Sequence, residues 1–181
     1  MDTDQIECLL RKTYHHEAIT ADFLGVFPSD QLPLPFSRWP AAFVANTDPS
    51  DRPGQHWVAV YQESPSRPLE FFDSCGLSPE FFSLTLPISP LILNNKQLQG
   101  FDSNVCGHYC IFFLVHRPLA RSFRDTLNLI SALGASTKDR DQTVQSLIRM
   151  HMFYPRVSCD SSHSHSQCCV PRNLFNKVIN S

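Results

Sequence analysis

Hydrophobic and polar residues follow two different periods along this chain. Near the N-terminus, Ile6, Leu9 and Leu10 recur at helical spacing, which predicts a helix over residues 3–15 capped by Thr3. Short runs rich in Val, Phe and Ala predict strands at 41–46, 57–62 and 69–73, the first two buried on both faces. A further strand is expected within residues 91–99, and the proline-rich residues 28–40 are expected to form an extended connection.

The second half of the chain is predicted to be helical. Residues 105–117 form a segment that is apolar nearly all round, so this helix should lie buried at the centre of the domain until Pro118 ends it. Two more helices are expected at about 122–133 and 139–153. The order of one helix, then strands, then helices is typical of an α+β domain.

Length and composition are compatible with one domain that buries a real core. The chain has 181 residues, of which 42% are hydrophobic, and its longest purely apolar run, Cys110–Val115, is far shorter than the ~20 residues of a membrane helix. The acidic N-terminus lacks the basic and then apolar layout of a secretion signal, which indicates an intracellular protein. We expect one domain over residues 1–156 and a tail rich in Cys, His and Ser over residues 157–181.

The net charge of −2 hides an uneven distribution. Residues 1–104 carry a formal charge of −7, whereas residues 105–181 carry +5. A basic half can mark a surface for DNA or another acidic partner, although solvated basic faces on an ordinary domain give the same count.

Seven cysteines without a secretion signal favour a catalytic or metal-binding role over a disulfide scaffold. Cys106 begins the buried helix, where free N–H groups and the helix dipole lower the pKa of a thiol. Gly107 removes a side chain where the backbone of a substrate would approach. Cys110, one turn further on, and Cys8 are expected in the core, and Cys75 has no obvious activating neighbour.

A nucleophilic thiol needs a base, and His56 is the best placed histidine. It opens a predicted strand after a turn, and the indole of Trp57 is expected to shield its ring. Asp73 ends the next strand, and antiparallel pairing would bring it beside His56 to orient the imidazole. The backbone N–H of Cys106 and the side-chain amide of Gln99 are the expected donors to an oxyanion.

The spacing of these residues resembles that of a known protease group. His56-Trp57, Asp73 seventeen residues after His56, and Gln99 seven residues before Cys106-Gly107 are similar to the cysteine proteases that include adenovirus protease (adenain) and the ubiquitin-like-protein proteases. Residues 23–27, 43–47 and 97–107 resemble adenain more closely, and the similarity extends over about residues 1–155.

This resemblance implies a papain-like, adenain-like fold. In it, a mostly antiparallel central sheet would pack against the buried helix that carries the nucleophile. Cys106 would be the nucleophile, His56 the general base and then acid, Asp73 the orienting group, and Gln99 an oxyanion donor. Trp57 and Gly107 would border the substrate.

The resemblance also implies a monomeric endopeptidase in the host nucleus and virion. It would cleave precursor proteins of a virus, or of a virus-derived element, after small residues at Gly-Gly or Gly-X sites.

Three departures from adenain bear on this interpretation. Adenain has Glu at the position of Asp73, where the ubiquitin-like-protein proteases have Asp. Adenain is activated by a viral peptide through a disulfide, but Ile88 stands at the cysteine position here. Adenain is strongly basic and uses DNA as a cofactor, whereas only the C-terminal half of this chain is basic. The chemistry itself is expected to need no cofactor.

Two other functions and one tail signal stay open at this point. The same catalytic residues would serve a deubiquitinase or a protease for ubiquitin-like modifiers, and an inactive binding module could retain the fold. The tail carries five metal-capable side chains whose spacing fits no standard zinc module. They belong either to a disordered or packed tail or to a zinc site or an intermolecular disulfide, and no catalytic metal is expected. They are Cys159, His163, His165, Cys168 and Cys169.

Overall fold

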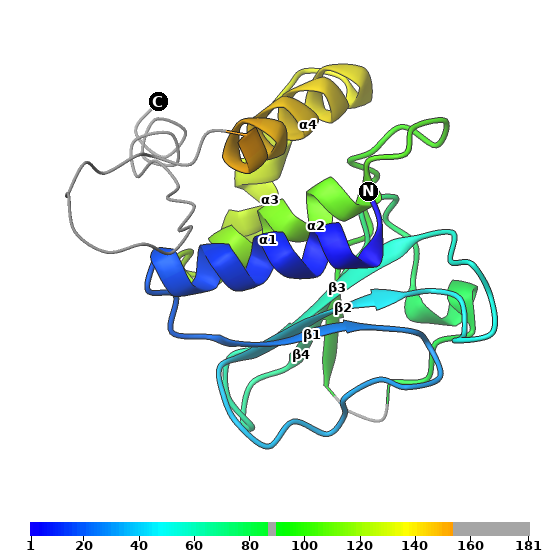
Figure 1. The fold of residues 1–181 in the computed structure, drawn as a ribbon, viewed down its shortest axis with the longest axis vertical. Helices are drawn as coiled ribbons and strands as arrows, with labels where there is room; N and C mark the ends of the chain where they lie inside the picture. The colour runs from blue at the N-terminus through cyan, green and yellow to red at the C-terminus, as the bar shows by residue number, and fades with distance from the viewer. Residues whose placement is uncertain (87–89, 154–181) are drawn as a thin grey trace, which may run out of the picture.

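Four helices and a five-stranded sheet make up residues 1–86 and 90–153, the part of the chain that the computed structural model describes (Figure 1). The order confirms an α+β fold. The predictions for the tail at 157–181 and for Ile88 lie outside the described residues. In chain order the elements are α1 (Thr3–His16), β1 (Asp22–Phe27), β2 (Ala41–Asn46), β3 (Trp57–Gln62), β4 (Leu69–Phe72), the 3-10 helix η1 (Pro79–Phe82), β5 (Leu91–Leu93), α2 (Cys106–His116), α3 (Phe123–Ser131) and α4 (Thr137–Phe153).

The sheet is mixed, so the expectation of a mostly antiparallel sheet is wrong. The strands lie in sequence order, β1 to β5. The two central pairings, β2 with β3 and β3 with β4, are antiparallel, whereas β1 with β2 and β4 with β5 are parallel. Parallel neighbours need a connection that returns along the sheet. The proline-rich residues 28–40 supply that return before β2, and the segment that includes η1 connects β4 to β5.

Both faces of the sheet are covered, which explains the apolar β2 and β3. Helices α1, α2 and α3 lie on one side of the sheet in Figure 1, and their side chains share a core with the strands. On the other face, Phe43 and Phe71 of the sheet pack with Phe36 from the proline-rich segment and Leu84 from the segment after η1. Every residue of α2 is buried, as its all-round apolar pattern predicts.

Four local details differ from the sequence-based expectations. Asp2 caps α1 instead of Thr3: its carboxylate accepts the Gln5 N–H, and the Gln5 side chain accepts the Asp2 N–H. Residues 22–27 form a strand, which the sequence pattern did not predict. The strand expected within residues 91–99 ends at Leu93. Cys8 is exposed on α1, so its expected place in the core is wrong.

Some of the basic charge in the C-terminal half is internal. The guanidinium of Arg117 is buried and donates two hydrogen bonds, of 2.6 and 2.7 Å, to the carboxylate of Glu70. Arg140 is also buried and donates to the carbonyl of Leu98 at 3.0 Å. These two of the nine basic residues therefore do not contribute to an outer surface. No described helix combines the length and the apolar character that crossing a membrane requires.

Candidate active site

Cys106 is the first residue of the buried helix α2, at the end of the helix where N–H groups lack helical partners. Val105 precedes it, and no side chain caps this helix start within the described residues. The backbone N–H groups of Gly107 and of Trp57, the first residue of β3, donate instead to the sulfur of Cys106. The start of α2 thus directs its positive end at the thiol.

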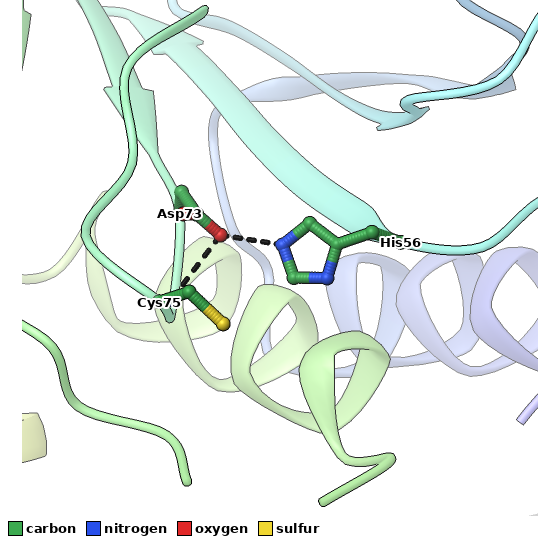
Figure 2. Close-up of side chains that lie close together, drawn as sticks. All are labelled: His56, Asp73 and Cys75. Atoms are coloured by element: carbon green, nitrogen blue, oxygen red, sulfur yellow. Dashed lines mark hydrogen bonds and ion pairs between the residues drawn. The ribbon is translucent and has the colours of Figure 1, made fainter. Parts of the chain in front are cut away.

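His56 lies directly before β3 and is held by Asp73, the residue after β4 (Figure 2). Its Nε2 atom is 2.5 Å from Oδ1 of Asp73, as the antiparallel pairing of β3 with β4 predicts. Because Nε2 is engaged with Asp73, Nδ1 is the ring nitrogen left for the thiol of Cys106, with which the imidazole forms a hydrogen bond.

Asp73 is completely buried and is oriented from several sides. Besides His56, its carboxylate accepts the backbone N–H of Leu77 at 2.7 Å and that of Cys75 at 3.2 Å. These bonds hold the carboxylate beside the imidazole. The sharp turn after β4 that supplies both N–H groups includes Gly76, whose φ of +76° favours glycine.

The pKa values of the thiol and the imidazole shift in opposite directions. Burial lowers the pKa of His56, but the hydrogen bonds and negative charges of Asp73 and Cys106 outweigh it and raise the value to about 9. Burial raises the pKa of Cys106, but the hydrogen bond and charge of His56, with the N–H groups of Trp57 and Gly107, bring it below its ordinary value. Both shifts favour a thiolate beside an imidazolium.

The pKa values of the two neighbouring thiols and of the nearest other histidine shift in the directions opposite to those of Cys106 and His56. Burial and the charge of Asp73 raise the pKa of Cys75 to about 12, and complete burial raises the pKa of Cys110. Burial lowers the pKa of His108 to about 4, so this residue is a neutral side chain on α2 and not a partner for Cys106. These findings agree with the ranking of Cys106 above the other two thiols.

Gln99 is buried in the segment that leads to Cys106, and both ends of its amide are assigned by hydrogen bonds. Its Oε1 accepts from the hydroxyl of Ser74 at 2.7 Å, and its Nε2 donates to the carbonyl of Ser103 at 2.7 Å. An amide nitrogen carries two hydrogens, so one remains for a further acceptor. The role of Gln99 in an oxyanion hole stays a prediction.

Trp57 and Gly107 have packing roles that the sequence did not predict. A Cβ at Gly107 would lie 2.9 Å from Cδ1 of Ile6 on α1 and 3.4 Å from Cδ1 of Trp57. Glycine therefore lets α1 and α2 pack closely here, and contact of either residue with a substrate stays a prediction. The ring that stacks on the imidazole of His56 is Phe82 of η1, with centroids 5.3 Å apart and planes 22° from parallel.

Two further residues that hold the site were also missed. Asn94 follows β5, where its side chain accepts the Asp73 N–H at 2.9 Å and donates to the Asp73 carbonyl at 2.6 Å. Asp141 of α4 accepts the Gly100 N–H at 3.1 Å and the Tyr109 hydroxyl at 2.8 Å, which ties the loop after Gln99 to α2. A polar side chain just after an apolar strand, as at Asn94, is the one signal from which such a role could have been predicted.

A comparison of the chain with known protein families finds none that matches. The function is therefore inferred from the site itself. It joins a thiol at a helix N-terminus, an imidazole and a buried carboxylate in one line of hydrogen bonds. Such an arrangement supplies a nucleophile, a proton carrier and an orienting group.

Proposed function

We propose that this protein is a cysteine endopeptidase with a papain-like active site of the adenain type. The observation that carries the proposal is the line Cys106–His56–Asp73, in which the thiol pKa is lowered and the imidazole pKa is raised to about 9. A structural cysteine in a core has the opposite shift, as Cys110 illustrates. The resemblance in residue spacing supports the same assignment.

In the first half of the reaction, the thiolate of Cys106 attacks the carbonyl carbon of the scissile peptide bond. The imidazolium of His56 then gives its Nδ1 proton to the nitrogen of the leaving amine, and the C–N bond breaks. A thioester between Cys106 and the acyl part of the substrate results. Asp73 keeps Nε2 engaged throughout, so Nδ1 stays directed at the reacting atoms.

In the second half, His56 is neutral and acts as a base. Its Nδ1 accepts a proton from a water molecule, whose oxygen attacks the thioester carbonyl. The C–S bond breaks, the carboxylic acid product leaves, and the thiolate and imidazolium return.

Each addition step creates a negative charge on the carbonyl oxygen. The backbone N–H of Cys106, at the start of α2, and the remaining amide hydrogen of Gln99 are the donors that we assign to it. Both groups are fixed before substrate arrives: the first by the helix, the second by Ser74 and Ser103. Preorganised donors of this kind stabilise the transition state without rearrangement.

The substrates that we propose are precursor proteins of a virus or a virus-derived element, cleaved after small residues at Gly-Gly or Gly-X sites. This substrate class, the host nucleus and virion as locations, and DNA as a partner come from the resemblance to adenain. The burial of Arg117 and Arg140 limits any DNA contact to the other basic residues.

A second candidate function is the removal of ubiquitin or a ubiquitin-like modifier. The specific observation in its favour is Asp73, since the resembling modifier proteases have Asp where adenain has Glu. Both functions use a substrate that ends in Gly-Gly, so the catalytic residues alone do not separate them.

One comparison of substrates tests both functions. The purified chain would be assayed on an aliphatic-X-Gly-Gly peptide reporter and on ubiquitin with a C-terminal fluorophore, with and without DNA and reducing agent. Cleavage of the peptide reporter over ubiquitin supports the endopeptidase, and the reverse preference supports the modifier protease. Cleavage of neither under any condition would favour the inactive binding module.

A further inference from the structure

A cavity is lined by strand β5 and the first turns of helix α3, and none of the proposed catalytic residues borders it. Its volume is about 530 Å³, which is within the range of roughly 300–1,000 Å³ that small-molecule sites have. One part of its lining is apolar, and the other part carries charges. The charged side chains are those of Glu63, Arg67, Glu70, Arg117, Arg121 and Arg124.

Both carboxylates of this lining already have cationic partners. Glu70 accepts two hydrogen bonds, of 2.6 and 2.7 Å, from the guanidinium of Arg117. Glu63 lies 3.5 Å from the guanidinium of Arg67 and 3.7 Å from that of Arg117. Glu70 and Arg117 are both buried, so this wall of the cavity is fixed before a ligand arrives.

Arg121 and Arg124 are the two cations of the lining whose charge is not neutralised. Both are exposed, and no carboxylate in the described part of the chain forms an ion pair with either of them. In the sequence they flank Phe123 and Ser122, the N-cap of α3, and both of these residues also line the cavity. The positive end of the helix dipole lies at this first turn. Asp125 accepts the Ser122 hydroxyl at 2.7 Å but does not line the cavity, so an anion inside it would meet a net positive charge.

The apolar part of the lining favours a ligand that is more than a bare anion. Ile92 of β5 is 41% exposed although its side chain is large and hydrophobic, and Leu127 of α3 is half-buried. Removing apolar surface of this kind from water stabilises a complex by about 25 cal/mol per Å². An inorganic anion would leave this surface in water, whereas an organic anion with a flat apolar body would cover it.

We propose that this cavity binds a small organic phosphate of mononucleotide size. The phosphate groups accept hydrogen bonds from the guanidinium groups of Arg121 and Arg124, and the apolar body of the ligand packs against Ile92 and Leu127. Binding is noncovalent, so no bond of the ligand is formed or broken.

Arginine suits this role because its planar guanidinium donates two parallel hydrogen bonds to phosphate oxygens and always keeps its charge. Arg117 is not among the partners of the ligand, because Glu70 and the carbonyl of Ala120 already accept its hydrogen bonds. The site goes beyond the proposed function and does not depend on it, since neither Arg121 nor Arg124 takes part in the proposed reaction.

ADP is a suitable probe, because it joins a diphosphate to a flat ring, and pyrophosphate and adenosine each supply one half of it. Each compound is titrated by calorimetry into the unaltered full-length chain and into the variants Arg121→Gln and Arg124→Gln. Arg38→Gln is the matched control, since it removes an exposed arginine, before β2, that does not line the cavity. Circular dichroism of each version checks that the fold is kept.

We expect one equivalent of ADP to bind to the unaltered chain and, with the same affinity, to Arg38→Gln. Arg121→Gln and Arg124→Gln should each weaken binding by about tenfold or more, because each loses a charge-assisted hydrogen bond to phosphate. Pyrophosphate and adenosine should both bind more weakly than ADP. The proposal is overturned if the unaltered chain does not bind ADP, if both variants bind it as tightly as the unaltered chain, or if pyrophosphate binds as tightly as ADP.

A short DNA duplex, titrated at the same salt concentration, separates a small ligand from a nucleic-acid backbone. Duplex binding that is tighter than that of ADP and is lost in Arg121→Gln and Arg124→Gln would assign the two arginines to nucleic acid and overturn the proposal. Duplex binding that is weaker than that of ADP, or that both variants leave unchanged, supports the small ligand. These titrations measure no cleavage, so they decide the site whether or not the chain is a protease.

Discussion

The hydroxyl of Ser74 donates a hydrogen bond of 2.7 Å to the side-chain oxygen of Gln99, and this bond sets which end of the amide faces the loop before Cys106. With its oxygen held by Ser74, Gln99 turns its nitrogen toward Ser103. Ser74 immediately follows Asp73, so one short segment after β4 positions both the orienting carboxylate and the proposed oxyanion donor.

Replacing Ser74 with alanine should impair the oxyanion donor while leaving the thiol and the imidazole in place. The amide of Gln99 would lose the partner that fixes its orientation, so we expect kcat to fall about tenfold with little change in KM. The pH dependence should stay the same, because the hydroxyl of Ser74 bonds to the neutral amide of Gln99. Ser66→Ala, at an exposed serine in the turn after β3, is the matched control and should retain full activity. An unchanged kcat for Ser74→Ala would contradict the role of this bond.

The pH profile of kcat/KM should be bell-shaped. Activity rises with pH as Cys106 loses its proton, below the ordinary thiol range because its pKa is lowered. Activity falls again as pH passes about 9, where His56 loses the proton that the leaving amine needs. A profile that only begins to rise near the ordinary thiol pKa and has no falling limb would show that the ion pair does not form.

Asp73→Asn should lower the rate by about three to four orders of magnitude, because an amide favours the wrong tautomer of His56. It should also move the falling limb of the pH profile to lower pH, since Asp73 is a main cause of the raised pKa of His56. Asp51→Asn, at an exposed position in the turn before β3, is the control for loss of one negative charge. Loss of activity without any shift of the falling limb would indicate that Asp73 acts only through the fold.

Gly107→Ala tests the packing role of this glycine. The added methyl would meet Cδ1 of Ile6 at 2.9 Å, so we expect the free energy of unfolding to fall by about 1–3 kcal/mol in urea titrations. Ile6→Val removes that Cδ1 atom, and the alanine should cost less in the Ile6→Val background. Additive costs in the double variant would show that the two side chains do not compete for this space.

The sequence was most informative where a local pattern alone determines the structure. The all-round apolar segment predicted the buried helix α2, and the end of one strand beside the start of the next predicted the contact of Asp73 with His56. Both predictions depend on local pattern and simple strand geometry, and neither needs knowledge of the chain path between the elements.

The sequence was least informative where contacts join distant segments. The stacking of Phe82 on His56 and the hydrogen bonds of Asn94 to Asp73 depend on the path of the chain between β4 and β5. Its described residues 74–86 form only the short helix η1 and carry no periodic pattern. The two parallel pairings of the sheet were missed for the same reason, since the direction of an edge strand is set by its connection. The requirement for glycine at position 107 comes from Ile6, 101 residues earlier, whereas the sequence analysis had related this glycine to the approach of a substrate.

The central claim is that Cys106 is an activated nucleophile that cleaves peptide bonds, and Cys106→Ser tests it most directly. The aliphatic-X-Gly-Gly reporter would be incubated with the unaltered chain, with Cys106→Ser and with Cys110→Ser, which lacks a buried thiol one turn away on the same helix. The account predicts that Cys106→Ser loses cleavage entirely while it keeps the helical circular dichroism of the unaltered chain, and that Cys110→Ser retains substantial activity. Cleavage by Cys106→Ser at the rate of the unaltered chain would contradict the account.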